Sequence, residues 1–364
     1  MMTNRERIIN TFLCLTAFDA ESFHEQEIGQ ELQARLTELG LRTQMDAAGN
    51  LYGVLEATRD GEPLLFSAHM DTVSPGKGKK AVVGEDGIIR SDGTTVLGAD
   101  DLSGIVSILE ALRVIRDNGL DHPVIEVLIT VAEEPFCRGS AAFDYGWIRS
   151  KEAYVLDLSG PIGTAALAAP SILALDITVK GKAAHAGFAP EKGINALNAA
   201  VKALARIRTG RVDADTTVNF GLIEGGSVRN AVPETVSVKG EIRSMKQERV
   251  REEAEMIRRT FLEEAEKIGA SVQIEHPVDL PACSTERNAP VVKRFEKALA
   301  LLGYGEGTFI TTFGGSDNNR FFVRGISGIV TACAMENVHT TSEYTVIDEL
   351  QRSCELALTL MTME

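Results

Sequence analysis

The sequence has no hydrophobic segment that approaches the ~18 consecutive apolar residues needed for a membrane-spanning helix. The N-terminal stretch MMTNRERIINTFLCLTAF is partly apolar, but Arg5, Glu6 and Arg7 fall within a helical pattern and no small-residue cleavage site follows them. We therefore expect neither a membrane span nor a signal peptide.

Cysteine is scarce and follows no pattern. The chain has 5 cysteines, an odd number, and no two of them form a CxxC motif. They are Cys14, Cys137, Cys283, Cys333 and Cys354. This distribution indicates neither a disulfide framework nor a zinc site made of thiolates. The expected compartment is the reducing cytoplasm.

Positive charge is in deficit, with 37 Lys and Arg against 52 Asp and Glu and a formal net charge of −15. Nucleic acids and anionic membranes are bound through clustered Lys and Arg, so we expect neither as a partner. Carboxylates gathered at one site repel each other unless cations neutralise them. Part of this acidity therefore directs attention to a metal site.

The length of 364 residues exceeds the ~250 to 300 residues at which a single hydrophobic core usually stops growing. Two domains are therefore expected. The composition, 44% hydrophobic and 24% charged, is typical of a folded globular protein.

The first part of the chain alternates helix-like with strand-like segments. Helical spacing occurs over 5–18, 25–39 and 102–116. Apolar or β-branched runs of strand length occupy 51–56, 64–68, 124–131 and 153–158. The alternation resumes with a helix at 291–302 and strands at 308–312 and 328–334. This order predicts an α/β domain, discontinuous over 1–170 and 282–364, with a mainly parallel sheet and helices on both faces.

The middle of the chain has a different texture. Strand patterns at 172–180, 217–223, 234–243 and 271–276 are interrupted by helical patterns at 193–208 and 247–268. The resulting order, βαββαβ, is that of the ferredoxin-like fold. We expect an inserted α+β domain over 171–281.

Polar residues interrupt the sequence directly after the expected strands. His69 and Asp71 follow the strand at 64–68 with a spacing of two, which lets a carboxylate hold the second nitrogen of a metal-bound imidazole. Asp100 and Asp101 open the helix that follows residue 98. Taken alone, the first pair is also consistent with a surface or capping pair, and either aspartate with a helix N-cap.

Four further residues complete the set. Glu133 and Glu134 end the strand at 124–131, where one could ligate a metal while the other serves as a base. Asp157 lies inside an apolar run, which is costly unless the acid is paired or coordinated. His339 again lies just past a strand. Each of these residues alone could be an ordinary polar side chain on a solvent-exposed turn. Polar residues that gather at the strand ends of one sheet, however, indicate an active site.

The motifs AHMDTV, GADDLSG, TVAEEP, VLD, GKAAHAG, GGSDNN and MENVHTTSEY occur in this order between about residues 64 and 344. Together they resemble the motif set of the dinuclear zinc hydrolases that include peptidase T, the aminoacylases and the glutamate carboxypeptidases. GGSD and MENVHTTSEY are most similar to the peptidase T-like branch. The resemblance implies that the inserted domain serves as a lid and as the interface of a homodimer.

The resemblance also implies a role for each polar outlier. Asp100 would bridge two metal ions, with His69 and Asp157 completing one site. Glu134 and His339 would complete the other site. The remaining two roles are general base for Glu133 and orienter of His69 for Asp71. Ligation by histidine and carboxylate without thiolate suits two Zn²⁺ ions per chain, with Co²⁺ or Mn²⁺ as replacements.

By the same resemblance, His185 would reach the active site of the neighbouring subunit and support the oxyanion, although a turn histidine is the alternative. Substrate contacts are expected from Arg243, Asn219 and Asn230, and Arg suits a carboxylate through its planar fork. For the two asparagines, strand or turn roles remain open. Asp317 is a candidate for binding the substrate's α-amine.

The chain departs from the family pattern near the site. Relatives commonly have Lys where this chain has Leu102, and a glycine-containing turn where it has Pro135 to Arg138. Neither change removes an expected ligand or the base. Cys137, within that turn, is either an oxidisable thiol or a packed side chain.

The expected function is hydrolysis of short peptides, as a tripeptide aminopeptidase of the peptidase T type. The alternative within hydrolases is a deacylase of N-acyl amino acids or a carboxypeptidase of the same family. From a different class, the chain could be a metal-binding protein without activity. Glu133 argues against this last reading, because a structural metal site has no use for a base outside its ligand set.

Overall fold

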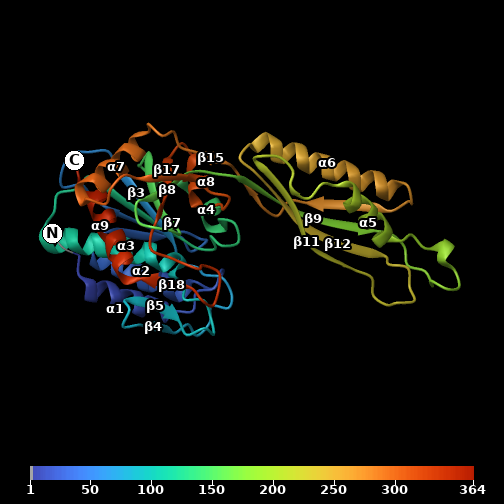
Figure 1. The fold of residues 1–364 in the computed structure, drawn as a ribbon, viewed down its shortest axis with the longest axis horizontal. Coiled ribbons are helices and arrows are strands. Elements are labelled where there is room, and N and C mark those ends of the chain that lie inside the picture. Colours follow the sequence, from blue (N-terminus) through green and yellow to red (C-terminus); the bar gives the residue numbers. More distant parts are fainter. Residues whose placement is uncertain (1–2) are drawn as a thin grey trace. The chain divides into compact units, whose positions relative to one another are not determined.

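The computed structural model describes residues 3–364. The chain divides into two compact units: the first comprises the residues up to Ala168 together with Cys283–Glu364, and the second is Ala169–Ala282. Both ends of the chain belong to the first unit (Figure 1). The second unit is thus an insertion in the sequence of the first.

The first unit is built on a sheet with the strand order β1-β2-β6-β3-β7-β17-β8-β15, and β16 pairs with β8. Its strands are β1 (Arg42–Met45), β2 (Leu51–Leu55), β3 (Leu64–His69), β6 (Ile125–Thr130), β7 (Glu152–Leu158), β8 (Thr164–Ala169), β15 (Cys283–Ser284), β16 (Thr308–Thr311) and β17 (Ser327–Ala332). The central strands β6, β3, β7 and β17 are parallel. This confirms the predicted mainly parallel sheet.

Helices cover both faces of this sheet (Figure 1). One face carries α1 (Arg5–Thr16), α2 (Gln26–Glu38), α3 (Ala99–Asn118), α7 (Pro290–Leu302) and α9 (Ile347–Thr362). The other carries α4 (Arg138–Ala142), η1 (Tyr145–Trp147) and α8 (Asp317–Phe322). No helix within residues 3–364 is both long and apolar enough to cross a membrane.

The central strands are apolar along their whole length because each face packs against its own core. In β3, Leu64 and Phe66 pack into the larger core with α3, whereas Leu65 packs into the smaller core with Phe321 of α8. Strands covered on both faces form continuous hydrophobic runs instead of alternating ones. This explains why these strands could be predicted from their apolar composition.

A small third sheet pairs β18 (Tyr344–Val346), β5 (Ile88–Ser91) and β4 (Ala81–Val83) in that order. It joins the segment after residue 339 to the segment before α3. The sequence predicted neither this sheet nor α9, because short strands and a C-terminal helix without flanking turn signals carry little local pattern.

The second unit has the predicted βαββαβ order. Its elements are β9 (Ser171–Lys180), η2 (Pro190–Lys192), α5 (Ala196–Arg206), β10 (Gly210–Arg211), β11 (Thr216–Gly225), β12 (Thr235–Ser244), α6 (Gln247–Glu266), β13 (Ser271–Glu275) and β14 (Asp279–Leu280). The strand order β11-β12-β9-β13 is antiparallel throughout. This is the arrangement of a ferredoxin-like sheet, as the sequence predicted.

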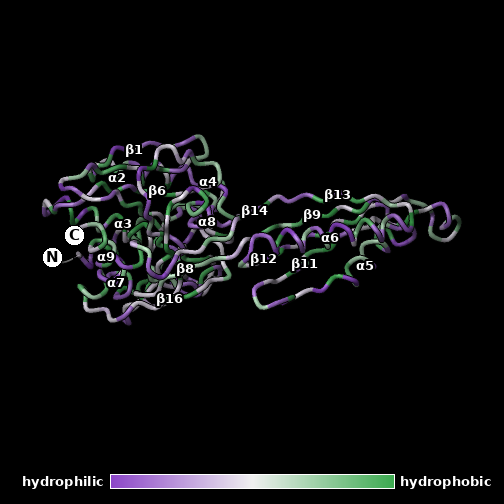
Figure 2. Tube along the Cα trace, turned by 90° about the horizontal axis from the view of Figure 1, so that it is seen from above, coloured by the Kyte–Doolittle hydropathy of each residue, from purple (hydrophilic) through white to green (hydrophobic). Residues whose placement is uncertain are grey.

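One face of the second sheet is covered by α5 and α6, which pack against each other and against β9 and β12. In β9, Leu173, Leu175, Ile177 and Val179 alternate toward these helices. Figure 2 shows that α6 is largely hydrophilic along the chain while β9 contains hydrophobic stretches. The opposite face of the sheet is more exposed.

Tight packing between α3 and the sheet gives a prediction about stability. A Cβ atom on Gly104 would lie 2.3 Å from the main-chain oxygen of Leu156 in β7 and 2.5 Å from Asp101 Oδ1. We expect Gly104→Ala to destabilise the first unit by about 1 to 3 kcal/mol, the usual cost of overpacking. Urea unfolding followed by the fluorescence of Trp147, the single tryptophan, reports on this unit.

The matched control is Gly29→Ala in α2, where the nearest atom is the flexible Cε of Met45 at 3.1 Å. Alanine is the better helix former, so this variant should be as stable as the wild type or more so. Equal unfolding midpoints for the two variants would contradict the packing argument.

Candidate metal centre

The carboxylate of Asp100 lies between two histidines. His69 Nε2 is 3.0 Å from Asp100 Oδ1, and His339 Nε2 is 3.1 Å from Asp100 Oδ2. His339 Nε2 also lies 3.0 Å from Oε2 of Glu134. Each oxygen of Asp100 thus faces a different histidine, which is the geometry needed if one carboxylate is to serve two cations.

The parallel sheet explains why these residues meet. His69 ends β3, Glu134 follows β6 and Asp157 lies near the end of β7, so all three are at the carboxyl edge of the sheet. Ligands bind at this edge in open α/β sheets. Asp157 Oδ1 is 3.8 Å from His69 Nε2. Among residues 3–364, three groups of side chains have ligand atoms within 4.8 Å of one another. Two of them contain His69, with Asp100 and Glu134 in one and with Glu133 and Asp157 in the other. The third comprises Glu133, Cys137 and Asp317.

Asp71 supports both the histidine and the glutamate turn. Nδ1 of His69 lies 3.0 Å from the main-chain oxygen of Asp71 and 3.3 Å from its Oδ1. The same carboxylate accepts hydrogen bonds from the N–H groups of Glu133 (2.9 Å) and Glu134 (3.2 Å) and from Ser22 Oγ (2.7 Å). The orientation of His69 is therefore shared between the backbone and the side chain of Asp71.

The buried acids shift one another's ionisation. Burial raises the pKa of both Asp157 and Glu133 well above the usual range. For Asp100, burial acts in the same direction, but hydrogen bonds from His339 and His69 lower the pKa below its ordinary value. Asp100 and Glu134 in turn raise the pKa of His339 to about 10. Cations would satisfy this negative charge as the histidines' protons do here.

The donor set fits divalent metal ions. Within residues 3–364, Oε1 of Glu134 is buried without a hydrogen-bond partner, although burying a polar atom unpaired costs about 1 to 3 kcal/mol. Imidazole and carboxylate donors with no thiolate among them suit zinc and its borderline neighbours.

The turns that carry these residues are strained. Left-handed backbone angles at non-glycine residues are uncommon, and such strain gathers at functional sites. Seven described residues have them, and most flank the glutamate pair or His339: Phe23, Ala132, Phe136, Cys137, Ala334, Asn337 and His339. This strain could not be predicted from the residue types, because none of these residues is a glycine.

Glu133 is 8% exposed, and its carboxylate lies within 4.8 Å of ligand atoms of His69 and Asp157. Its Oε1 accepts a hydrogen bond from the thiol of Cys137, at 3.2 Å. A buried carboxylate of raised pKa beside a metal site has the properties of a general base.

Glu343 is a supporting residue that the sequence analysis missed. Its carboxylate is 1% exposed and accepts the backbone N–H groups of Leu97 (2.6 Å), Gly98 (2.8 Å) and Asp100 (2.9 Å). It therefore holds the turn that presents Asp100. The signal was present in the MENVHTTSEY motif, but only the pairing of β18 with β5 brings Glu343 to that turn.

Of the remaining expected site residues, all but Asp317 lie on the second unit. Nδ1 of His185 accepts the N–H groups of Gly187 (3.2 Å) and Phe188 (3.1 Å), which leaves Nε2 as the ring donor of the neutral histidine. His185 is exposed and stacks on Phe188. Asn230 is exposed in the loop between β11 and β12, and its main-chain oxygen accepts the N–H of Ala186.

Asn219 and Arg243 are on neighbouring strands of the second sheet. Asn219 pairs with Glu241 in the register of β11 and β12, so both project from the same face as Arg243. Arg243 contacts Glu241 through Nε (2.8 Å) and a terminal nitrogen (3.1 Å).

The position of Asp317 does not suit the substrate-binding role expected for it. The residue is 2% exposed, and its two oxygens accept hydrogen bonds from the hydroxyl groups of Thr130 (2.5 Å) and Ser140. It lies in a buried group with Glu133 and Cys137. Because this carboxylate is buried and both of its oxygens accept hydrogen bonds, it is not exposed for binding a substrate amine.

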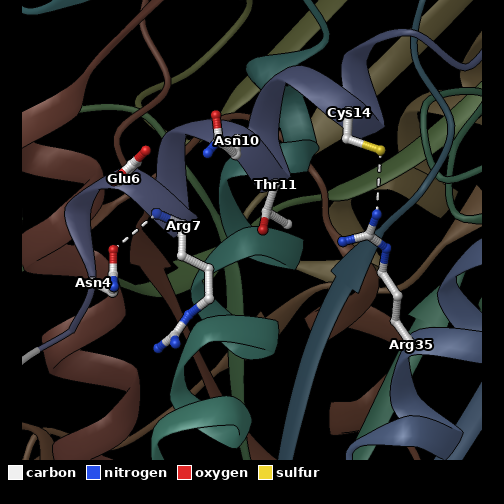
Figure 3. A pocket seen from close by; sticks show the side chains of 7 residues that line it. All are labelled: Asn4, Glu6, Arg7, Asn10, Thr11, Cys14 and Arg35. Carbon is white, nitrogen blue, oxygen red and sulfur yellow. Dashed lines mark hydrogen bonds between the residues drawn. The ribbon is translucent and has the colours of Figure 1, made fainter.

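A separate cavity of about 410 Å³ lies over α1 and α2 (Figure 3). It is lined by Asn4, Glu6, Arg7, Asn10, Thr11, Cys14 and Arg35. Its cations are already engaged, because Arg7 is bound by Glu110 at 2.6 Å and Arg35 by Glu31 at 2.7 Å. None of the expected site residues lines it.

Comparisons with known proteins extend over the whole chain. A family model described as a peptidase dimerisation domain matches residues 167–269, and one described as peptidase family M28 matches residues 50–205. Protein YqjE of Bacillus subtilis, which is uncharacterised, is 36% identical over 368 residues, covering 99% of each chain.

Two solved structures are similar throughout. Aminopeptidase PepT from Bacillus cereus has 36% identity and a TM-score of 0.89, with 100% of this chain and 99% of that chain covered. A tripeptidase from Staphylococcus aureus has 33% identity and a TM-score of 0.92, with the same coverage.

The three hydrogen bonds that Glu343 accepts from the Asp100 turn, called the Glu343 clamp below, give a prediction about metal content. We expect Glu343→Ala to bind less metal and to unfold at a lower temperature, because the N–H groups of Leu97, Gly98 and Asp100 lose a charged acceptor. Metal per chain after dialysis, measured by mass spectrometry, and the melting temperature test this.

The control is Glu336→Gln, on the same segment but half-buried. It should keep the metal content and the melting temperature of the wild type. If Glu343→Ala also keeps both, the hydrogen bonds from Glu343 do not hold the Asp100 turn.

Proposed function

Because the chain belongs to the peptidase T-like family of metallopeptidases, we propose that it releases the N-terminal residue of tripeptides at a centre of two divalent cations, with Glu133 as the general base. The observation that carries this proposal is the geometry of Asp100, with one carboxylate oxygen toward each of two histidines. Glu133 lies beside that centre, within 4.8 Å of ligand atoms of His69 and Asp157.

The proposed ligand sets follow from the contacts. His69 and Asp157 would hold one cation, Glu134 and His339 the other, and Asp100 both. Three ligand carboxylates leave a net charge of +1 against two divalent cations, which favours an anionic oxygen from water or substrate at the centre. Zinc is the metal we propose, with cobalt or manganese as replacements.

When bound, two such cations supply an acidified water and a polarised substrate carbonyl. Glu133 accepts the proton of the attacking water at its carboxylate and later donates it to the departing amine. Burial raises the pKa of Glu133, the direction that strengthens a carboxylate as a base. Asp71 keeps His69 and the glutamate turn in position during both transfers.

Tripeptides are proposed as substrates because the tripeptidase of Staphylococcus aureus is similar over the full length of the chain. The test is an activity screen of the dialysed protein with di- and tripeptides and with N-acetylated amino acids. Zinc, cobalt and manganese are added back separately. Cleavage of tripeptides with release of the N-terminal residue supports the proposal, whereas preferential cleavage of N-acetylated amino acids would make the chain a deacylase.

We further propose a cytoplasmic homodimer formed through the second unit. The match of residues 167–269 to a peptidase dimerisation domain supports the dimer, and the 5 free thiols suit a reducing compartment. In this dimer, His185 of one chain would donate from Nε2 to the oxyanion formed at the other chain's site. Arg243, Asn219 and Asn230 are proposed as substrate contacts.

Replacing the base should separate chemistry from metal binding. We expect Glu133→Gln to keep the metal content of the wild type and to lower kcat at least about 100-fold, because an amide keeps the shape but lacks the basic oxygen. Kinetics and mass spectrometry on the same sample measure both. Turnover near that of the wild type would remove Glu133 from the mechanism.

The dimer can be tested by complementation. Inactive His185→Ala and inactive Glu133→Gln are mixed under conditions of subunit exchange. One site of each heterodimer would then combine an intact Glu133 with an intact His185, restoring up to about half of the wild-type activity per dimer. If exchange is proven by mass and no activity returns, His185 acts within its own chain or has no part in the reaction.

A further inference from the structure

A buried thiol contacts the proposed base. Sγ of Cys137 lies 3.2 Å from Oε1 of Glu133, and the cysteine is 1% exposed. The proposed mechanism assigns it no role.

The backbone of the turn brings Cys137 back to Glu133. The N–H of Cys137 donates to the main-chain oxygen of Glu133 at 2.6 Å, and the cysteine has the left-handed φ of 56°. The turn then closes with Gly139 N–H on the main-chain oxygen of Val131, at 3.1 Å. A Cβ atom on Gly139 would lie 2.0 Å from that oxygen, so only glycine permits this closure.

The environment of Cys137 makes it a hydrogen-bond donor and not a reactive thiol. Burial, followed by the nearby charges of Glu133 and Asp317, raises the pKa of Cys137 well above its ordinary value. Reactive cysteines are exposed and have lowered pKa values. Of the two readings left open by the sequence, the structure therefore disfavours the oxidisable thiol.

The thiol of Cys137 is important because of the other groups that surround Glu133. Asp317, the other acid of the buried group, has its oxygens engaged by Thr130 and Ser140. It therefore offers Glu133 repulsion and no hydrogen bond. A carboxylate buried beside like charge has a well-defined orientation only where a donor fixes one of its oxygens.

We propose that Cys137 is a positioning residue for the peptidase reaction: its thiol fixes Oε1 of Glu133, so that Oε2 is the oxygen that exchanges the proton with water and amine. This inference rests on the proposed role of Glu133 as the base. Cys137 itself touches neither substrate nor metal in this assignment.

The kinetic test compares two substitutions of the thiol. Cys137→Ala removes the donor and should lower kcat about tenfold, with KM changed by less than about twofold, because the hydrogen bond acts on the base and not on substrate binding. Cys137→Ser keeps a donor and should restore kcat to within about threefold of the wild type. All variants are compared at equal metal content.

The matched control is Cys354→Ala. Cys354 is fully buried in α9, and its Sγ lies 3.9 Å from Ser107 Oγ, within the core of the first unit. Its truncation should lower stability and leave kcat unchanged. If Cys137→Ala behaves like this control, or if Cys137→Ser fails to restore kcat while remaining folded and metal-loaded, the positioning role is wrong.

An infrared measurement tests the hydrogen bond without relying on activity. The S–H stretching band of Cys137 is isolated as the difference between the wild type and Cys137→Ala. In Glu133→Gln, whose amide is a weaker acceptor than a carboxylate, this band should shift to higher frequency. An unshifted band would overturn the contact. If the band shifts but Glu133→Gln keeps full turnover, the proposed function fails and the contact stands.

Discussion

The site depends on the fixed position of one carboxylate. Asp100 is approached at each oxygen by a histidine, His69 from the end of β3 and His339 from the segment after β17. Its N–H is held by Glu343, so the turn before α3 cannot move without breaking a buried, charged contact. Removing one partner from such a buried network leaves the others unsatisfied, which costs more than the bond itself contributes. The geometry of both proposed metal positions follows from this single anchor.

The buried acids around the site repel one another, and the surrounding structure reduces this repulsion. Asp71 is neutralised by contact with His69 and by the N–H groups of the glutamate turn. Asp317 is surrounded by hydroxyl groups, and Glu133 by a thiol. Neutral donors lower the cost of each buried acid without adding a positive charge that would compete with cations. The strained turns are a consequence, because they bring backbone and side-chain donors to the acids at the expense of relaxed φ angles.

The sequence predicted what local pattern encodes. Apolar runs identified β3, β6 and β7, and the polar residues that follow them, such as His69, are brought together as expected for the carboxyl edge of a parallel sheet. The clamp by Glu343 could not be predicted, because it joins positions 243 residues apart through a small sheet with little pattern of its own. The burial of Asp317 could not be predicted from the sequence either, since it depends on hydroxyl groups from β6 and α4. Long-range contacts of single side chains leave no periodicity to read.

The position of His339 and Glu343 after the inserted unit also bears on biosynthesis. Domains generally fold as units during synthesis, and the first unit receives strand β17, the segment that carries His339 and helix α9 only after the inserted unit has been translated. Until then, Asp100 lacks both His339 and the clamp on its N–H. The proposed metal centre can therefore form only after the inserted unit and the segment that carries His339 have both been translated.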